Sequence, residues 1–443
     1  MTADLAGWGR YPRHNSNLLA PHSVAALCAM QASLDNYVAR GAGRAYGDAG
    51  IGLGSTIGMR ALNRMRDFDP VNGLVTVEAG VSLEEVIDAL LPRGWFVPAV
   101  PGTRFVTVGG MVAADVHGKN HHRTGGFGAH VASLKLLAPR GELLTCSRDE
   151  NCALFDATIG GMGLTGAIVE VTLRLIRVET GWVRQRTVAT RDLESTLAAL
   201  AKAEAEATYS VAWIDISPGR RPVGRGVVLL GEHALAAELP EGQPVVPPRR
   251  ARRLSIPVEL PEGLLNRWSV GAFNTLYHCK AALRGEADLV RWDSYFFPLD
   301  AIGNWNRMYG QSGFLQHQCV VPWPAGPEVV AEILDRVAAA GCAPFLAVLK
   351  SLGAGAGDLS FPMPGLTLTI DLRVTPQVLC LLDELDRIVV AAGGRLYLAK
   401  DARQSPNTFR AGYPGLADFE ALRREIGATG RLTSRLSERL AIQ

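Results

Sequence analysis

The clearest helical pattern in the chain lies at 82–91, where apolar and polar residues follow a helical period. The apolar positions recur at i, i+3, i+4, i+7 and i+8, and they are Leu83, Val86, Ile87, Leu90 and Leu91. Ser82 and Glu85 have the spacing of a capping box, and Pro92 and Gly94 end the pattern. We therefore predict an amphipathic helix that buries one face.

Short apolar runs with β-branched residues surround this helix and predict strands within the first 180 residues. Their ranges are 37–40, 74–78, 132–138 and 168–175, with a short helix at 151–158. From about residue 181 the pattern changes to longer helices and strands. The predicted helices are 190–206, 325–341, 376–392 and a helical tail at 416–443, and the predicted strands are 208–216, 224–231, 314–322, 366–374 and 395–399.

A segment rich in proline and arginine at 240–261 interrupts the second half. It carries Arg249, Arg250, Arg252 and Arg253 among six prolines and few residues suited to a core. We predict a mobile surface loop. Two interpretations stay open: a solvated basic loop, or a segment that closes over the entrance of a site beside an anionic membrane surface.

Composition and charge narrow the class of protein. The length of 443 residues predicts two or three domains, and 48% hydrophobic with 20% charged residues is typical of a globular protein. A net charge of +2 gives no argument for nucleic acid. The seven cysteines include no C-x-x-C pair, so we expect free thiols and a cytoplasmic location. The chain has no apolar run of about 18 residues and no signal-peptide pattern, which leaves a peripheral membrane position open.

Two glycine clusters could be mistaken for a dinucleotide-binding fingerprint. The cluster at 161–166 matches G-x-G-x-x-G, but the pattern predicts a helix before it and a strand after it, the reverse of the required order. The cluster that begins at Gly41 follows a strand, but Gly47, Gly50, Gly52 and Gly54 argue against a helix after it. We therefore predict that no Rossmann domain is present.

The same clusters suit another way of binding phosphate. Successive backbone N–H groups in a glycine loop form a concave anion nest without a helix dipole. The segments 40–47 and 101–110 have this character, and Thr103 and Thr107 add hydroxyl donors. A single cluster would be explained by a tight turn, but the third cluster at 160–166 favours a ligand site.

The segment 115–122 contains three histidines with Lys119 and Asn120. His117 and His121 would need a helix to share a face, and Gly118 interrupts one, so we predict no metal site. A polar wall of a ligand site is the preferred interpretation. Lys400 follows an apolar strand segment; it is either the first solvated residue or a lysine at the mouth of a site.

Together these motifs resemble the vanillyl-alcohol-oxidase superfamily of flavoenzymes, and within it the polyprenylphosphoryl-ribose 2′-oxidases. The resemblance covers nearly the whole chain. It rests on RGAGRAYGD at 40–48, PGTR at 101–104, VGG at 108–110, HGKNHH at 117–122, GGMGLTG at 160–166, FPLD at 297–300, WNR at 305–307, GFLQ at 313–316, FPMPG at 361–365 and YLAKD at 397–401.

The resemblance implies an α+β fold. A two-lobed PCMH-type FAD-binding domain is expected at 1–180, and a substrate-binding domain with an antiparallel sheet flanked by helices at 181–394. A C-terminal segment at 395–443 is expected to return to the FAD-binding domain. The flavin ring would then lie at the interface of the domains.

The resemblance also implies the residues of the site. The expected FAD-binding residues are Arg40, Gly41, Ala42, Gly43, Arg44, Ala45, Tyr46, Gly47, Pro101, Gly102, Thr103, Val108, Gly109, Gly110, Ala114, His117, Gly118, Lys119, Gly163, Gly166, Ile168 and Tyr397. The expected substrate-binding residues are Gln316, Gln318, Lys350, Thr369, Asp371 and Lys400.

Two positions depart from relatives in the superfamily. Many relatives attach FAD through a histidine in the first glycine loop, where this chain has Tyr46, so the resemblance implies non-covalent FAD. Mycobacterial relatives carry a cysteine beside the flavin, where this chain has Thr369, so the pocket that receives the substrate is altered.

The implied activity is FAD-dependent oxidation of a sugar secondary alcohol to a ketone by hydride transfer. The expected substrate is the 2′-hydroxyl of a polyprenylphosphoryl-ribose, in the first half of an epimerisation of cell-wall biosynthesis. A base must accept the hydroxyl proton, and Lys400, His117 and Tyr46 are the candidates. We find no second nucleotide fold, so a separate short-chain reductase is implied. Two alternatives stay open: an alditol or aldonolactone oxidase, and a non-catalytic flavin-binding partner subunit.

Overall fold

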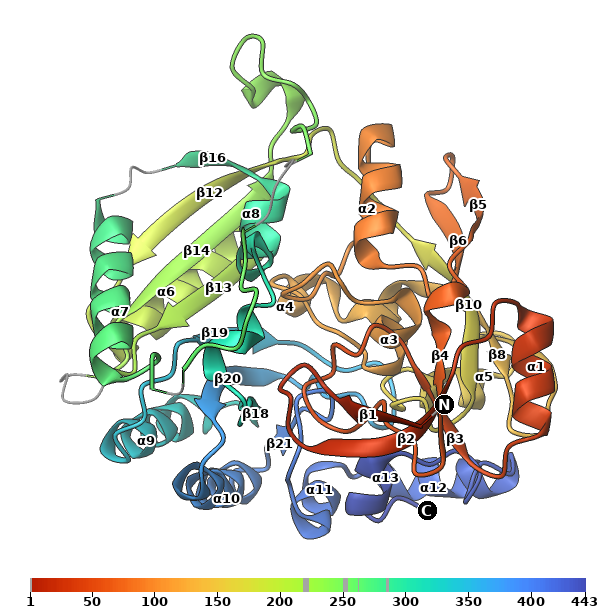
Figure 1. The fold of residues 1–443 in the computed structure, drawn as a ribbon. Helices are drawn as coiled ribbons and strands as arrows, with labels where there is room; N and C mark the ends of the chain where they lie inside the picture. Colours follow the sequence, from red (N-terminus) through yellow and green to blue (C-terminus); the bar gives the residue numbers. More distant parts are fainter. Residues whose placement is uncertain (1, 218–222, 250–253, 262, 284–286) are drawn as a thin grey trace.

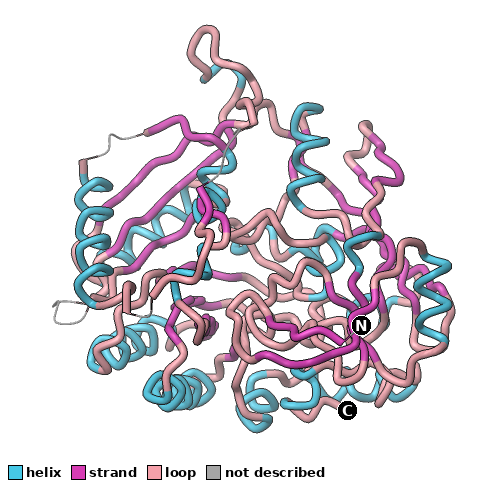
Figure 2. Tube along the Cα trace, in the orientation of Figure 1, coloured by secondary structure: helices cyan, strands magenta, loops and turns pink. Residues whose placement is uncertain are grey.

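The computed structural model describes residues 2–217, 223–249, 254–261, 263–283 and 287–443. Its N-terminal part contains two larger sheets and one two-stranded sheet (Figures 1 and 2). The first has the order β1-β2-β4-β3, in which β2, β4 and β3 are parallel and β1 is antiparallel to β2. Its elements are β1 (Thr2–Ala6), β2 (Arg13–Leu19), α1 (Val24–Ala32), β3 (Tyr37–Arg40) and β4 (Ser55–Gly58).

The second N-terminal sheet is antiparallel and has the order β5-β6-β10-β8-β9. Apolar residues of its inner face bury α2, whose capping box between Ser82 and Glu85 is confirmed. The elements of this lobe are β5 (Met65–Asp69), β6 (Leu74–Glu78), α2 (Leu83–Leu90), β7 (Trp95–Phe96), α3 (Val108–Ala113), α4 (His121–Thr124), β8 (Val131–Leu137), β9 (Leu143–Ser147), α5 (Cys152–Thr158), β10 (Ala167–Arg174) and β11 (Ile176–Arg177).

An eight-stranded sheet dominates the rest of the chain, with the order β16-β12-β14-β13-β19-β20-β18-β21. Its elements and their connections are β12 (Trp182–Ala189), α6 (Leu193–Glu206), β13 (Tyr209–Ile214), β14 (Gly226–His233), β15 (Leu254–Ser255), α7 (Arg267–Ala282), β16 (Asp288–Arg291), α8 (Trp292–Phe296), β17 (Ile302–Gly303), β18 (Phe314–Pro322), α9 (Gly326–Ala339), β19 (Ala347–Leu352), β20 (Gly365–Arg373), α10 (Pro376–Ala391) and β21 (Arg395–Leu396).

The strands of this sheet are buried on both faces by different partners. One face packs against α6, α9 and α10 through a single apolar core that includes Ala212, Val228 and Leu368. The residues next to them in sequence point to the opposite face, where Trp213 and Leu229 pack against α7. Because side chains alternate along a strand, each strand supplies both a core and a separate second surface.

The C-terminal segment runs from the eight-stranded sheet back to the first N-terminal sheet. It contains α11 (Pro406–Gly412), α12 (Leu416–Glu425) and α13 (Arg435–Arg439). The backbone N–H of Tyr37 donates to Arg431, and Arg439 forms ion pairs with both Asp48 and Asp401. The C-terminal segment therefore connects the first N-terminal sheet to the segment that follows the eight-stranded sheet. Within the described residues, no helix is long and apolar enough to cross a membrane.

The structure confirms the predicted α+β class and the type of each predicted element, with shifts of a few residues at the ends. Three expectations need correction. The segment at 108–110 is the first turn of α3 and not a loop, the strand at 395–399 ends at Leu396, and the tail contains two helices separated by a turn. The tail breaks because Gly427 and Gly430 adopt positive φ angles of 74° and 76°.

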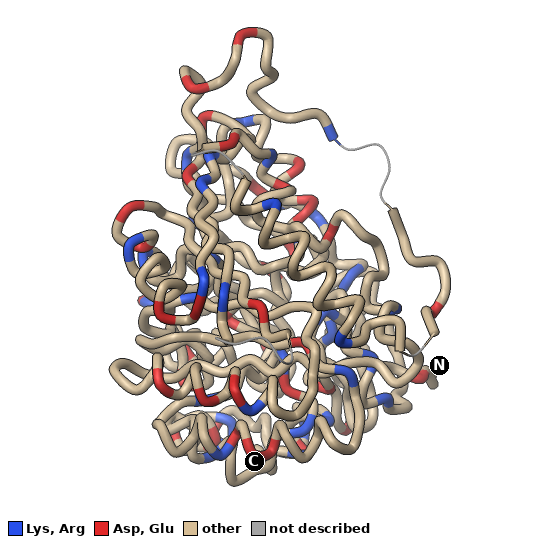
Figure 3. Tube along the Cα trace, turned by 90° about the vertical axis from the view of Figure 1, so that its left-hand side faces the viewer, with Lys and Arg blue, Asp and Glu red and all other residues tan. Residues whose placement is uncertain are grey.

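The proline- and arginine-rich segment is described only in part. Residues 236–249 project from the molecule in Figure 3 and carry Glu238 and Glu241 as well as Arg249. Arg249 lies 3.2 Å from Asp88 and 3.5 Å from Glu84 of α2, so its charge is already paired. Arg250, Arg252 and Arg253 lie outside the described residues.

Replacing Arg439 by methionine should destabilise the protein markedly, because it removes the guanidinium that is paired with the buried carboxylates of both Asp48 and Asp401. We expect a loss of about 3 kcal/mol, seen as a lower midpoint of urea unfolding. The matched control is Arg435→Met, which removes an exposed pair with Glu438 and should cost about 1 kcal/mol or less. Equal midpoints for the two variants would contradict this account.

Candidate active site

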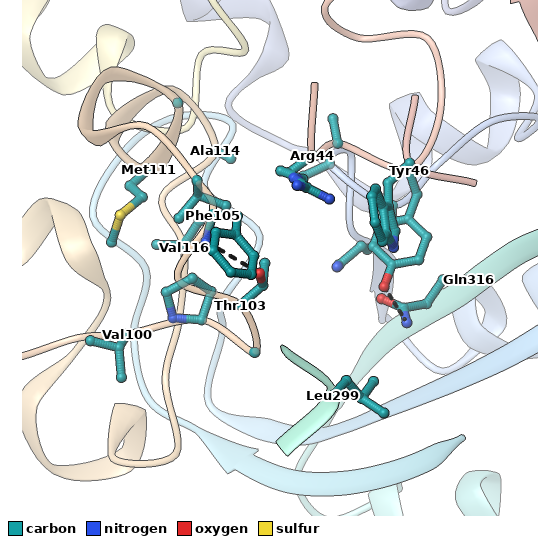
Figure 4. Close-up of a pocket in the computed structure, with 18 of the residues that line it drawn as sticks. Arg44, Tyr46, Val100, Thr103, Phe105, Met111, Ala114, Val116, Leu299 and Gln316 are labelled. Atoms are coloured by element: carbon teal, nitrogen blue, oxygen red, sulfur yellow. Dashed lines mark hydrogen bonds between the residues drawn. The ribbon is translucent and has the colours of Figure 1, made fainter. Parts of the chain in front are cut away.

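A cavity of about 620 Å³ lies between the N-terminal lobes and the second face of the eight-stranded sheet. This volume is within the range of cofactor and ligand sites. The lining residues include the glycine loop at 39–46, most of the segment 100–119, side chains from β13, β14, β18, β19 and β20, and residues at 296–305 and 397–400. Figure 4 shows Arg44 and Tyr46 on one side of the cavity and Thr103, Phe105 and Val116 facing them.

The first glycine loop is pressed against its neighbours and has no room for side chains. A Cβ atom at Gly41 would lie 2.1 Å from Oγ1 of Thr107, and one at Gly43 would lie 2.4 Å from a guanidinium nitrogen of Arg40. Gly43 also has a φ of +65°, which L-residues rarely adopt. Arg40 is fixed in turn, because it donates to the carbonyls of Ala6 and Gly50. A bare, rigid backbone therefore faces the cavity, as a phosphate-binding nest requires.

The segment 100–119 forms the opposite wall of the same cradle. Gly102 lines the cavity, and a Cβ atom there would meet nothing within 4 Å. Thr107 caps α3 by accepting from the N–H of Gly110, and it separates the two glycine loops. Two backbone walls with hydroxyl groups between them fit the pyrophosphate and ribose of FAD.

Seven of the predicted site residues do not line the cavity: Gly47, Val108, Gly109, Gly163, Gly166, Ile168 and Asp371. Packing accounts for several of these glycines. A Cβ atom at Gly166 would lie 2.6 Å from the side chain of Leu136, and one at Gly109 would lie 2.8 Å from Ala79. Ile168 is part of the core of the second lobe. From the third glycine cluster, the neighbouring Met162 reaches the cavity instead.

Side chains that alternate along β18, β19 and β20 form the polar wall of the cavity with one face and the core with the other. Gln316 and Gln318 of β18, Thr369 of β20 and Lys350 of β19 line the cavity. The residues between them, such as Leu315, Cys319 and Leu368, are buried in the core against the helices. A shift of one residue in any of these strands would exchange the two sets.

A chain of polar contacts connects four of the predicted site residues. The side-chain amide of Gln316 donates to Oη of Tyr46 at 3.2 Å and to Oδ1 of Asp371 at 2.5 Å. The ammonium of Lys400 lies 3.9 Å from the centre of the Tyr46 ring. Asp371 stands behind this wall, so it acts on the cavity through Gln316 and through its charge.

Burial sets the protonation of this group. It raises the pKa of Asp371 to about 7 and lowers the pKa of Lys400 to about 7. The Asp371 carboxylate opposes the shift of Lys400, and Lys350 adds to it. Burial raises the pKa of Tyr46 well above its usual value, so its hydroxyl keeps its proton at neutral pH.

His117 is a neutral acceptor in this arrangement. Its Nε2 atom lies 2.8 Å from the side-chain nitrogen of Gln318, which donates to it. Burial, and after it Lys350, hold the pKa of His117 well below its usual value. Its ring packs against the rings of Tyr397 and Phe361.

Asn120 and His121 of the histidine-rich segment are structural and do not line the cavity. Asn120 donates to the carbonyl of Pro98 at 2.8 Å, and His121 accepts from the N–H of Gly353 at 2.9 Å. Gly118 and Lys119 do line the cavity, and burial lowers the pKa of Lys119 to about 7. In the described part of the chain, no group of three His, Cys, Asp or Glu side chains is arranged to hold a metal ion.

The sequence reasoning missed an apolar end of the cavity. Its lining residues come from β13, β14, α7, the turn after α8 and the region of β19, and they are Val211, Trp213, Leu229, Tyr277, Leu299, Leu346 and Val348. Side chains alternate between two faces in the predicted strands at 208–216 and 224–231, but both faces are apolar. The sequence pattern therefore did not show which face of these strands borders a ligand.

Comparisons with known proteins agree with this geometry. A family model described as an FAD binding domain matches residues 20–147. The chain is 38% identical to decaprenylphosphoryl-β-D-ribose oxidase of Mycolicibacterium smegmatis, over 100% of this chain and 98% of that protein. It is 36% identical to an uncharacterized protein of Streptomyces coelicolor, over 82% of this chain and all of that protein. D-arabinono-1,4-lactone oxidase of Yarrowia lipolytica is 32% identical over only 28% of this chain and 24% of that protein.

Replacing Gly43 by valine should abolish FAD binding, because a side chain at φ +65° would collide with Arg40 and distort the cradle. We expect purified Gly43→Val to contain less than about a tenth of the flavin of the natural protein, measured by absorbance. Gly341→Val is the matched control, since Gly341 has a similar φ of +71° but does not line the cavity, and this variant should retain flavin. Full flavin content in Gly43→Val would show that this loop does not hold the cofactor.

Proposed function

This chain belongs to the family of the decaprenylphosphoryl-β-D-ribose oxidases, FAD-dependent oxidoreductases, and we propose that it oxidises the 2′-hydroxyl of a polyprenylphosphoryl-ribose to a ketone. The observation that carries the proposal is the match along the whole length of both chains, including the strands that form the cavity wall. The lactone oxidases match only within a part of the chain, so an alditol or aldonolactone oxidase is the second candidate.

We propose that the glycine loop at 41–46, the segment 101–103 and Gly110 hold the FAD, with the ring beside Lys400 and His117. When bound, FAD supplies the acceptor for the hydride removed from the alcohol carbon. The domain boundaries at 181 and 395 belong to the same proposal, because the lining residues come from both sides of each boundary.

Lys400 is the proposed base that takes the proton of the substrate hydroxyl. With a pKa of about 7 it is partly neutral at physiological pH, which an unperturbed lysine is not. The other candidates have less suitable chemistry. Tyr46 keeps its proton, and the free lone pair of His117 already accepts from Gln318.

The ketone formed here requires a second enzyme if the reaction is an epimerisation. The sequence contains no second nucleotide-binding motif, so we propose that a separate short-chain reductase returns hydride to the product. The first experiment is to mix the FAD-loaded protein anaerobically with a short-chain prenylphosphoryl-ribose, with lactones and with alditols. Bleaching of the flavin by the prenylphosphoryl-ribose supports the proposal, whereas bleaching only by a lactone or alditol favours the second candidate.

The FAD should be released intact when the protein is denatured by acid or heat. The first glycine loop carries Tyr46 where a histidyl link would need a histidine, and the Tyr46 hydroxyl accepts from Gln316. After precipitation, the flavin absorbance should be in the supernatant and chromatograph as FAD. Flavin that stays with the precipitated protein would contradict non-covalent binding.

Replacing Lys400 by methionine should slow flavin reduction by about 10²–10⁴-fold, the usual contribution of a general base, while FAD content is retained. Lys400 accepts a proton only when neutral, so the rate in the natural protein should rise as the pH rises through about 7. The exposed Lys202 serves as control, and Lys202→Met should react normally.

Two further variants should move this pH profile in opposite directions. Asp371→Asn removes the charge that raises the pKa of Lys400, so the inflection should move to lower pH. Lys350→Met removes the charge that lowers it, so the inflection should move to higher pH. Stopped-flow measurement of flavin reduction across the pH range tests both, and a shift of both variants in one direction would exclude Lys400 as the titrating base.

A further inference from the structure

Helix α7 presents an apolar stripe to solvent. Trp268 is 74% exposed, Leu276 is 70% exposed, and Leu283 just beyond the helix is 88% exposed. With the exposed Ala272 and Cys279 they recur at intervals of three, four or seven residues, so they share one side of the helix. Exposed large apolar residues on other elements, such as Val71 between β5 and β6 and Leu143 of β9, lie apart from this stripe in sequence and fold. A contiguous stripe of this kind marks an interaction surface.

The charged residues of α7 are all basic. The helix contains Arg267 and Lys280 and no aspartate or glutamate. The guanidinium of Arg267 lies 4.8 Å from the centre of the Trp268 ring, so a cation and an indole stand together at the start of the helix. Tryptophan beside basic residues, with aliphatic residues on the same side, is the composition of helices that lie in a membrane interface.

The stripe continues into the cavity through aromatic side chains. Phe273, 44% exposed, stacks on Tyr277 with ring centres 6.2 Å apart and packs against Phe345. Tyr277 packs edge-on against Trp213 at 4.9 Å, and both line the apolar end of the cavity. An apolar path therefore runs from the outer surface of α7 to the interior of the site.

We propose that α7 lies on the surface of a phospholipid bilayer that contains anionic lipids, with Trp268 and Leu276 in the interface. The lipid chain of the substrate then passes over Phe273 and Tyr277, while the sugar reaches the polar wall of the cavity. This inference rests on the proposed lipid-linked substrate, and it explains why an exposed helix beside the cavity is apolar and basic. The helix is at the edge of the molecule in Figure 1, on the side that Figure 3 faces.

The test is co-sedimentation of the FAD-loaded protein with mixed phosphatidylglycerol–phosphatidylcholine vesicles. The natural protein should bind at low salt and be released as salt rises, since basic residues contribute through screened attraction. The double variant Trp268→Ser, Leu276→Ser should bind about tenfold or more weakly, because it loses two interfacial apolar groups. Val71→Ser removes an equally exposed apolar residue from the turn between β5 and β6 and should bind normally.

A second measurement does not depend on the stability of the double variant. Cys279 is exposed on the stripe, and Cys152 is exposed on α5, away from α7 in Figure 1. A polarity-sensitive thiol dye on Cys279 should shift its emission to the blue when vesicles are added, whereas the dye on Cys152 should not. The exposed cysteines are Cys152, Cys279 and Cys380, and in each labelled protein the two that do not carry the dye are replaced by serine.

Failure of this proposal is distinguishable from failure of the proposed function. Flavin bleaching by a water-soluble, short-chain prenylphosphoryl-ribose tests the function, and it should be the same in the double variant and the natural protein. Absence of vesicle binding, equal binding by the double variant, or no dye shift at Cys279 would overturn the membrane role of α7. A dimer that dissociates in the double variant, without vesicle binding, would assign the stripe to a second copy of the chain instead.

Discussion

The site depends on the contact between the first glycine loop and the segment that carries Lys400. The backbone N–H of Tyr46 donates to the carbonyl of Ala399 at 2.8 Å, and a Cβ atom at Gly47 would lie 2.0 Å from the carbonyl oxygen of Asp401. Arg439 secures the same junction, with 2.8 Å to each of the carboxylates that follow the two segments. Because the backbones touch, Lys400 is held over the Tyr46 ring instead of extending into solvent.

A second constraint is the excess of positive charge in the cavity. Burial lowers the pKa of Lys119 and Lys400 to about 7 and that of Lys350 to about 8, and Asp371 is the carboxylate that opposes the shift of Lys400. Ammonium groups without water around them are costly unless an anion joins them. The phosphoryl group of the proposed substrate, together with the phosphates of FAD, is such an anion. Binding of these anions would raise the pKa of the nearest lysines and keep them charged. A lysine that the anions do not reach would keep its lowered pKa and could accept the proton.

The sequence allowed most of the local structure to be predicted, because helices and strands of this fold bury one face or follow a clear period. The capping box of α2 and the alternation of β18 and β20 are direct examples. The helix α7 was not predicted, because its exposed side is apolar and its pattern does not mark a core. Asp371 was expected to bind substrate, but it lies behind Gln316 and does not line the cavity. This position depends on the packing of β18 against β20 and cannot be read from the sequence. Trp8, Arg44 and Asp300 meet at the cavity from distant segments, and no local pattern could have grouped them.

The order of strands in the large sheet gives the cavity a gradient from apolar to polar. Along the order β14-β13-β19-β20-β18, the lining side chains are Leu229, then Val211 and Trp213, then Val348 and Lys350, then Thr369, and finally Gln318 and Gln316. Each of these faces the cavity because of its parity along its strand, so a single sheet positions them all. A ligand with a sugar at one end and a lipid at the other has one favourable direction on such a surface. For the proposed substrate, the sugar would lie beside Lys400 and Gln316, and the lipid would leave past Trp213 and Tyr277 towards α7. The proposed orientation of the substrate thus rests on strand order and side-chain alternation, before any specific contact to the sugar is considered.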